Sequence, residues 1–237
     1  MLQVLGFVLV PIYACVSALR RGSEALSSQS QERSYQEWVA AGIPPARIAR
    51  EILLARALLL LPDAITLAVL HTYTYVFASA PMALSAGLPD KVVALLNEYL
   101  SHLWEVGFIF FAFILVFYMF YFAAAFFGVL TRSTVGRVTL VFGYIVAHLV
   151  APPLLYLLIF FLYTNPLEGT LNAITFLVTA THPVSAIYCA IVMYHDPFGS
   201  SIASEVGRYG LSVIFQLLLA YLFYRLAVRV FTRRLIG

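Results

Sequence analysis

The chain has 237 residues, of which 62% are hydrophobic and only 11% are charged, whereas soluble domains carry about 25% charged residues. A water-soluble fold of this size could not bury so much apolar surface, which excludes an ordinary soluble globular protein. The net charge of +3 says little by itself, because the placement of basic residues decides how a membrane protein is oriented.

Long apolar segments follow one another along the chain. Residues 2–19 form the first, which Arg20 and Arg21 close. No basic segment precedes it and no small-residue cleavage site follows it, so it is predicted to be a retained helix and not a signal peptide. Each such segment has roughly the 20 residues that cross a bilayer. Further spans are predicted over residues 46–80, 104–130, 138–163 and 211–230, with a tight polar turn over residues 131–137.

Two segments do not fit a simple crossing. Residues 90–103 have apolar residues at helical spacing and are predicted to form an interfacial helix on the outer surface. Residues 173–194 are apolar but are interrupted by Thr181, His182 and Pro183, which favours a re-entrant hairpin. The predicted fold class is therefore an all-α, polytopic integral membrane bundle in one domain, residues 1–237, with five to six transmembrane helices, this hairpin and a cytoplasmic coupling helix.

The basic residues indicate the orientation, because lysine and arginine near helix ends stay in the cytoplasm. If the polar loop over residues 20–50 is cytoplasmic, twelve of the 14 basic residues are inside and only Lys91 and Arg208 are outside. This count requires that residues 173–194 do not cross fully. We therefore expect a multi-pass protein of the plasma membrane with a cytoplasmic C-terminus.

Few residues suggest catalytic chemistry. Cys15 and Cys189 lie in apolar segments and are interpreted as small core residues. Ser200 and Ser201 lack a recognisable base, and no glycine-rich phosphate loop is present. The histidines are scattered without metal-ligand spacing, so we expect no catalytic residue, no metal and no cofactor held by this chain. They are His71, His102, His148, His182 and His195.

Asp63 is the exception, because it follows Pro62 within an apolar helix, where a carboxylate is costly. One interpretation places Asp63, together with His71, on a translocation path or proton relay. The structural interpretation makes it a carboxylate near the cytoplasmic interface that is hydrogen-bonded to a neighbouring helix. The sequence leaves both open and favours the structural one.

The polar loop carries the strongest pattern. A helix with charged and aromatic residues leads to Gly42, at the position of a left-handed C-cap. The pair Pro44-Pro45 then enforces an extended turn before a new helix. A short rigid helix held below the membrane by two spans is a shape that a soluble partner can push.

This loop resembles the coupling segment of ATP-binding-cassette (ABC) permeases of the type-2 exporter class. Residues 26–37, 42–45 and 48–57 occupy the places of that family's Glu-Arg stretch, its small or proline-containing turn and its following helix. The helical pair joined by a basic turn over residues 130–137 and the basic C-terminal helix resemble the same class. Its members usually have six spans with both termini inside, so we expect one helix to be missing from the N-terminus.

The resemblance implies a permease subunit of an exporter, which forms the translocation pathway with a second permease subunit, identical or related. ATP would be bound by separate ATP-binding cassette subunits, and no nucleic acid is implied. The alternatives are the transmembrane coupling component of a vitamin or metal uptake system, and a membrane enzyme or proton-coupled carrier using Asp63. The docking and coupling residues expected from the loop are Glu32, Arg33, Tyr35, Glu37, Trp38, Gly42, Ile43 and Pro44.

Overall fold

The computed structural model describes residues 2–26, 29–79, 103–131, 133–147 and 202–236, together with the positions Val93, Asn97, Leu100 and Leu154. The expected re-entrant segment 173–194 lies outside these residues, and so does nearly all of the expected interfacial helix 90–103. Outside them too are the remaining residues considered for chemistry: His102, His148, His182, His195, Cys189, Ser200 and Ser201.

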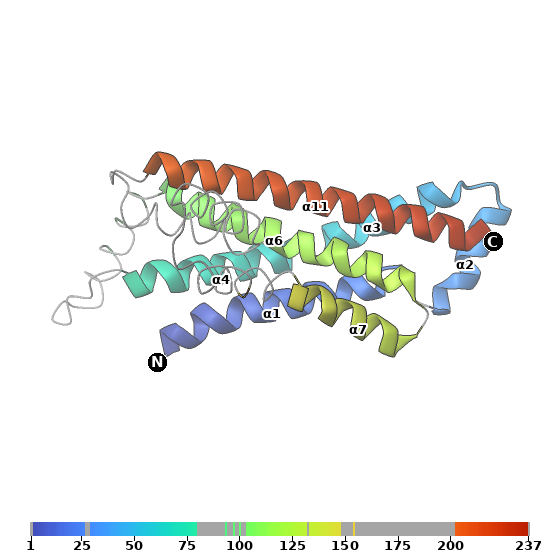
Figure 1. The fold of residues 1–237 in the computed structure, drawn as a ribbon, viewed down its shortest axis with the longest axis horizontal. Coiled ribbons are helices and arrows are strands. Elements are labelled where there is room, and N and C mark those ends of the chain that lie inside the picture. The colour runs from blue at the N-terminus through green and yellow to red at the C-terminus, as the bar shows by residue number, and fades with distance from the viewer. Residues whose placement is uncertain are drawn as a thin grey trace, which may run out of the picture.

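The elements of these residues are helices that lie side by side along one axis (Figure 1). Helices α1, α6 and α11 run toward the end where the C-terminus lies, while α3, α4 and α7 run away from it. The N-terminus lies at the opposite end. The bounds are α1 Leu2–Glu24, α2 Gln29–Ala40, α3 Pro45–Leu59, α4 Leu61–Ser79, α6 Leu103–Leu130, α7 Thr134–Ile145 and α11 Ile202–Ile236.

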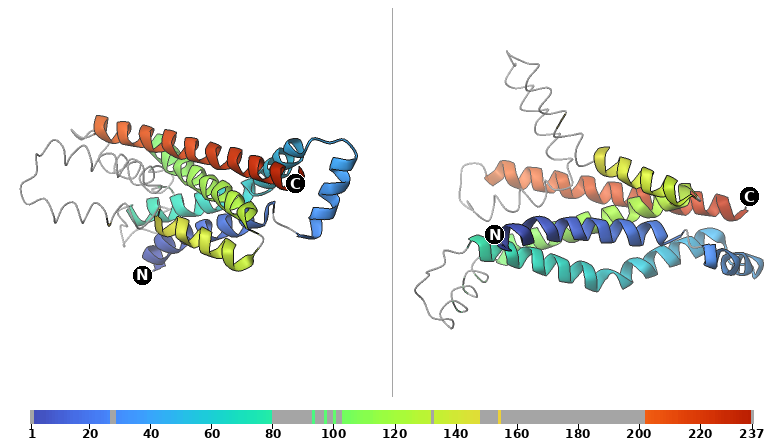
Figure 2. Two further views of the ribbon diagram at one scale, coloured as in Figure 1. Left: turned by 45° about the vertical axis from the view of Figure 1, so that its right-hand side comes forward. Right: turned by 90° about the horizontal axis from the view of Figure 1, so that it is seen from below.

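Among the described residues, three helical stretches are long and apolar enough to cross a membrane. They are Pro45–Tyr73, which joins α3 and α4, Val106–Leu130 and Val206–Ile236. The short helix α2 is different: it crosses the C-terminal end of the bundle steeply to the long helices (Figure 2). A helix in that position lies along a membrane surface when the long helices span the membrane.

Several predicted helix bounds were wrong in detail. The first and last helices extend past their apolar segments, to Glu24 and to Ile236. The predicted helix over residues 46–80 is broken at Leu60, just before Pro62. Helix α7 begins at Thr134 and not at residue 138, because the Ser133 side chain caps it by accepting a hydrogen bond from the Gly136 N–H.

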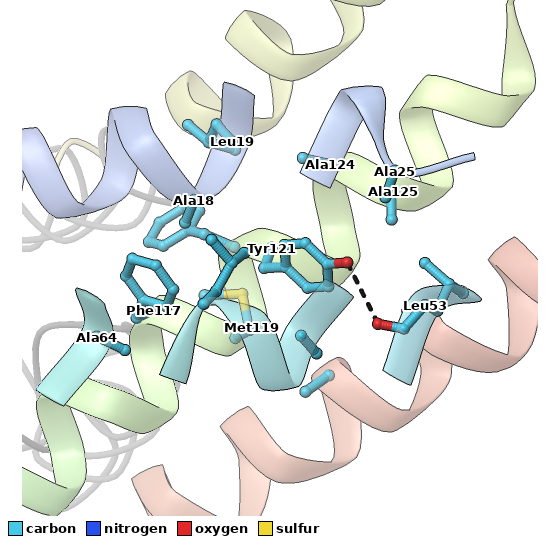
Figure 3. Close-up of a cluster of buried hydrophobic side chains, with 14 of the residues drawn as sticks. Ala18, Leu19, Ala25, Leu53, Ala64, Phe117, Met119, Tyr121, Ala124 and Ala125 are labelled. Carbon is cyan, nitrogen blue, oxygen red and sulfur yellow. Dashed lines mark hydrogen bonds between the residues drawn. The ribbon is translucent and has the colours of Figure 1, made fainter. Parts of the chain in front are cut away.

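Helix α6 is the centre of the bundle and packs against α1, α4 and α11. Its large side chains fill the core, while α1 and α4 present small residues to it, such as Ala18 and Ala64 (Figure 3). This pairing of large with small residues lets the helices approach closely without voids. The fully buried large side chains of α6 are Ile109, Phe117, Met119, Phe120 and Tyr121.

Two glycines allow α1 and α6 to touch through their backbones. A Cβ atom added to Gly22 would collide with the carbonyl oxygen of Tyr121, and one added to Gly128 would collide with the carbonyl oxygen of Ser23. Only glycine leaves room for such contacts. The α1–α6 contact near the C-terminal end of the bundle therefore depends on Gly22 and Gly128.

Candidate functional site

The candidate site is the elbow between α2 and α3. Gly42 has φ of 85° and is the positive-φ residue of the described chain. The Ile43 N–H donates to the Trp38 carbonyl at 3.0 Å, and the Gly42 N–H donates to the Val39 carbonyl at 3.0 Å. This pair of bonds is a Schellman motif. The predicted left-handed cap at Gly42 is confirmed.

The proline pair fixes the other half of the elbow. Pro44 has φ of −60° and ψ of 130°, and Pro45 is the first residue of α3, where a missing N–H costs nothing. The Arg47 N–H donates to the Pro44 carbonyl at 2.8 Å. With two ring-fixed φ angles and a capped helix before them, the elbow sets the angle between α2 and α3 rigidly.

Helix α2 is anchored by Tyr35 and exposes Trp38. The Tyr35 side chain is 3% exposed and its ring meets that of Phe231, in α11, edge-on at 5.5 Å between centroids. Burial raises the pKa of Tyr35, while the nearby Arg56 charge acts in the opposite direction. Trp38 is 44% exposed. The centroid of its ring lies 5.8 Å from that of the Tyr35 ring. One aromatic residue thus holds α2 to the bundle and the other faces outward.

The other expected docking residues divide in the same way. Glu37 and Pro44 are exposed, whereas Ile43 is half-buried and packs against the core. Glu32 and Arg33 lie within α2, but their side chains lie outside the described part of the structure. The outward surface of the elbow is therefore formed by Glu37, Trp38, Gly42 and Pro44.

Side chains of α6 support the break between α3 and α4. Pro62 has no N–H, so the regular hydrogen-bond ladder of the helix is interrupted there. The Tyr118 hydroxyl donates to the Ala57 carbonyl at 2.8 Å, and the Tyr121 hydroxyl donates to the Leu53 carbonyl at 3.3 Å (Figure 3). The Ala57 carbonyl also accepts from the Leu60 N–H at 3.1 Å, since a carbonyl oxygen has two lone pairs and can accept a second bond. The two tyrosines therefore tie the C-terminal part of α3 to α6.

Arginines connect the helix ends to one another. Arg56 donates to the carbonyl of Glu24, at the end of α1, at 2.9 Å. Arg234, near the end of α11, donates to the carbonyl of Val129 at 3.3 Å. Carbonyls in the last turn of a helix lack intrahelical donors and carry partial negative charge. These guanidinium groups satisfy them and join α3 to the end of α1 and α11 to the end of α6.

Asp63 forms an ion pair with Arg21 of α1, whose Nη1 donates to Asp63 Oδ2. The Arg21 and Asp63 side chains are 48% and 47% exposed. The pair explains how a carboxylate is accommodated in an apolar helix, because pairing offsets its desolvation. This contact to a neighbouring helix is the arrangement that the structural interpretation of Asp63 expected.

The structure does not bring Asp63 and His71 into contact. They are eight residues apart on α4, or about 12 Å along the helix axis. His71 is buried and its ring stacks on Phe113 of α6, with 5.1 Å between centroids. Cys15 is partly buried and packs against the core. Within the described residues, His, Cys, Asp and Glu side chains form no group of three that could hold a metal ion.

These features define the class. The chain is a polytopic bundle of apolar helices of membrane-spanning length, with a short amphipathic helix and a capped elbow at one end. Comparison with protein-family models, with curated proteins and with solved structures found no match.

The Arg21–Asp63 pair gives a first testable prediction. We expect Asp63→Asn and Arg21→Gln each to lower the stability of the folded chain, and the double variant to lose less than the sum of the two. The expected coupling free energy is about 1 kcal/mol, as for polar contacts between membrane helices. The more exposed pair Arg47–Glu51, at 2.7 Å, is the matched control and should show weaker coupling, because solvent screens it. Reversible unfolding in bicelles measures both cycles, and additive Arg21 and Asp63 effects would show that the pair does not join α1 to α4.

Proposed function

We propose that the chain is the transmembrane permease subunit of an ATP-driven ABC transporter of the exporter class. It works with separate ATP-binding subunits and with a second permease subunit, identical or related. The observation that supports this most is the elbow: a short helix crosses the end of the bundle, is anchored inside by Tyr35 and presents Trp38 outward. This is the geometry that a cytoplasmic motor can push against.

In this proposal the C-terminal end of the bundle is cytoplasmic. The polar loop, the start of α7 and the end of α11 lie there together (Figure 1), and these segments carry most of the arginines. Helix α6 ends and α11 begins at opposite ends of the bundle, so an odd number of crossings connects them. One crossing after Thr134, followed by a segment that enters and leaves on the outer side, satisfies this count. It gives five spans in a chain of the plasma membrane.

The contacts also suggest how a push on α2 would travel. The Schellman cap and Pro44-Pro45 join α2 rigidly to α3. Tyr118, Tyr121 and Arg56 join α3 to α6 and α1. A nucleotide state that favours one position of α2 would therefore favour one arrangement of the bundle, as a switch between two access states requires. This chain supplies the pathway and the coupling surface, and ATP binds to its partner.

No described contact favours the carrier alternative centred on Asp63 and His71. Arg21 gives Asp63 a local role in helix packing, and His71 lies about two turns away with its ring stacked on Phe113. We therefore place the function at the elbow and not at Asp63.

The test is whether the chain captures and stimulates an ATPase. The tagged chain is co-expressed with the ATP-binding subunit encoded in a neighbouring reading frame, purified and reconstituted in nanodiscs. We expect the two to purify together and ATP hydrolysis to rise above that of the ATP-binding subunit alone. A chain without an ABC motor among its neighbouring frames, or one that neither binds nor stimulates it, contradicts the proposal.

A further inference from the structure

One inclined row of side chains on α11 changes character along the helix. Its members are spaced four residues apart and all are exposed, and residues at this spacing form a continuous ridge. The row begins with apolar Leu217, passes through Tyr221 and continues as arginine. The arginine row, as we name its last three members, is Arg225, Arg229 and Arg233.

The arginine row has no carboxylate partner within the described chain. After Glu205 the sequence contains no acidic residue. Arginines of the other helices at this end are paired instead: Arg20 with Glu24 at 3.7 Å, and Arg47 with Glu51 at 2.7 Å. The neighbouring Arg234 turns inward to the Val129 carbonyl. Three adjacent positive charges are thus exposed on one face without a carboxylate partner among the described residues, where an anionic group from outside the chain can bind.

The apolar and aromatic residues of the same row indicate which environment surrounds α11. Toward the N-terminus of α11 the same side exposes large apolar residues, including Ile214, Leu217 and Leu218, as a lipid-facing surface does. The Arg225 guanidinium lies over the Tyr221 ring, 5.9 Å from its centroid, and tyrosine is typical of the boundary between hydrocarbon and headgroups. The apolar, aromatic and basic parts thus follow the order of layers in a bilayer.

The length of the helix agrees with this placement. The apolar stretch Val206–Ile236 has 31 residues, which at 1.5 Å per residue is about 46 Å, whereas the hydrocarbon layer is roughly 30 Å thick. A helix of this length extends beyond the hydrocarbon unless it is strongly tilted, and its C-terminal turns, which carry the arginine row, are the part suited to the headgroup layer. The nine residues from Arg225 to Arg233 are separated by eight rises of the helix, about 12 Å, enough to pass through the layer of lipid headgroups.

We propose that the arginine row is a binding surface for anionic phospholipid at this end of the bundle. The guanidinium groups bind the phosphate and any further anionic group of the headgroup, because their forked N–H donors match phosphate oxygens. The acyl chains lie along Leu217, Leu218 and Tyr221. This inference does not depend on the proposed transport function.

The experiment compares the wild-type chain with two triple variants. The test variant is Arg225→Gln/Arg229→Gln/Arg233→Gln, and the control is Arg20→Gln/Arg47→Gln/Arg50→Gln, which removes the same charge at the same end. Each purified protein is titrated with phosphatidylglycerol and with phosphatidylcholine of identical acyl chains, and retained lipid is counted by native mass spectrometry. Elution volume and helical ellipticity confirm that each variant is folded.

We expect the wild type and the control to prefer phosphatidylglycerol, and the test variant to lose that preference. Each arginine near an anionic membrane surface contributes about fivefold in binding, so the triple substitution should reduce it roughly 100-fold. A triple Arg→Lys variant keeps the charge and should retain most of the preference.

Four results would overturn the proposal. The first is a test variant that retains as much phosphatidylglycerol as the wild type, and the second is a control that loses as much as the test variant. The third is a wild type without preference for the anionic lipid, in which case an acidic protein surface is the better occupant. Soluble glycerol phosphate should not displace the bound lipid, since it lacks the acyl chains; displacement by it, the fourth result, would show a phosphate site and not a lipid surface.

Discussion

Replacing Gly128 by alanine should lower the stability of the bundle by about 1–2 kcal/mol. The added Cβ would meet the Ser23 backbone directly, and backbone atoms of α1 cannot rotate away as a side chain can. Overpacking of a tight contact typically costs about 1–3 kcal/mol, while the better helix propensity of alanine returns at most about 1 kcal/mol. The clash therefore decides the sign. Gly22→Ala, against the Tyr121 carbonyl, should act in the same direction.

Gly107 provides the control for this prediction. It lies on the same helix, α6, but a Cβ atom there would have no neighbour within 4 Å. Gly107→Ala should leave stability unchanged or raise it slightly. Unfolding of the three variants in bicelles, followed by tyrosine and tryptophan fluorescence, measures the differences. Equal stability of Gly128→Ala and Gly107→Ala would mean that the backbones of α1 and α6 do not touch at this place.

The elbow could be predicted because its signals are local. A glycine after an aromatic and charged helix, followed by two prolines, determines the backbone within a few residues. Gly42 and Pro44 therefore have the conformations that the sequence indicated, while Pro45 already belongs to the helix that follows. The same local reasoning could not show which side of α2 faces the bundle. Tyr35 and Trp38 have similar chemistry, and only the position of Phe231, nearly 200 residues later, separates a buried ring from an exposed one.

The contacts between helices could not be predicted from periodicity. Arg21 and Asp63 are 42 residues apart, and Arg56 and Glu24 are 32 residues apart. Apolar segments indicate that helices exist but not which helices are neighbours. Gly22 and Gly128 did carry a usable signal, since glycine within a membrane helix often marks a close contact. Pro62 carried another that the predicted continuous helix over residues 46–80 did not use, since a proline interrupts helical hydrogen bonding and the structure breaks the helix at Leu60.

Helix lengths exceeded the apolar segments for a simple reason. An apolar segment ends where side chains meet water or headgroups, whereas a helix ends where its backbone hydrogen bonds stop. Helix α1 continues through Arg20 and Arg21 to Glu24, and the Glu24 carbonyl is then bound by Arg56. The end of helix α1 therefore coincides with a carbonyl that Arg56 of α3 binds, and not with the end of the apolar segment.

Under the proposed function, Gly42→Val and Trp38→Ala should abolish most of the stimulated ATP hydrolysis without unfolding the bundle. At Gly42 the surroundings are open, with nothing within 4 Å of an added Cβ, so the penalty comes from the positive φ alone. A β-branched residue is strongly disfavoured there, whereas asparagine tolerates it. Gly42→Asn is thus the matched control and should retain most of the activity. The valine variant should lose the Schellman cap and change the angle between α2 and α3.

Trp38→Ala tests the outward face of the same helix. An exposed aromatic residue that fills a pocket on a partner typically contributes about 2 kcal/mol or more, which corresponds to roughly 30-fold in binding of the ATP-binding subunit. Glu37→Gln removes an exposed charge and should cost only about 0–1 kcal/mol. Tyr35→Ala should instead destabilise the chain itself, since Tyr35 is buried against Phe231. Stimulated ATP hydrolysis, partner affinity and thermal stability are measured for all four proteins. If Trp38→Ala binds and stimulates the motor as the wild type does, α2 is not the coupling surface, and the transporter proposal loses the observation on which it rests.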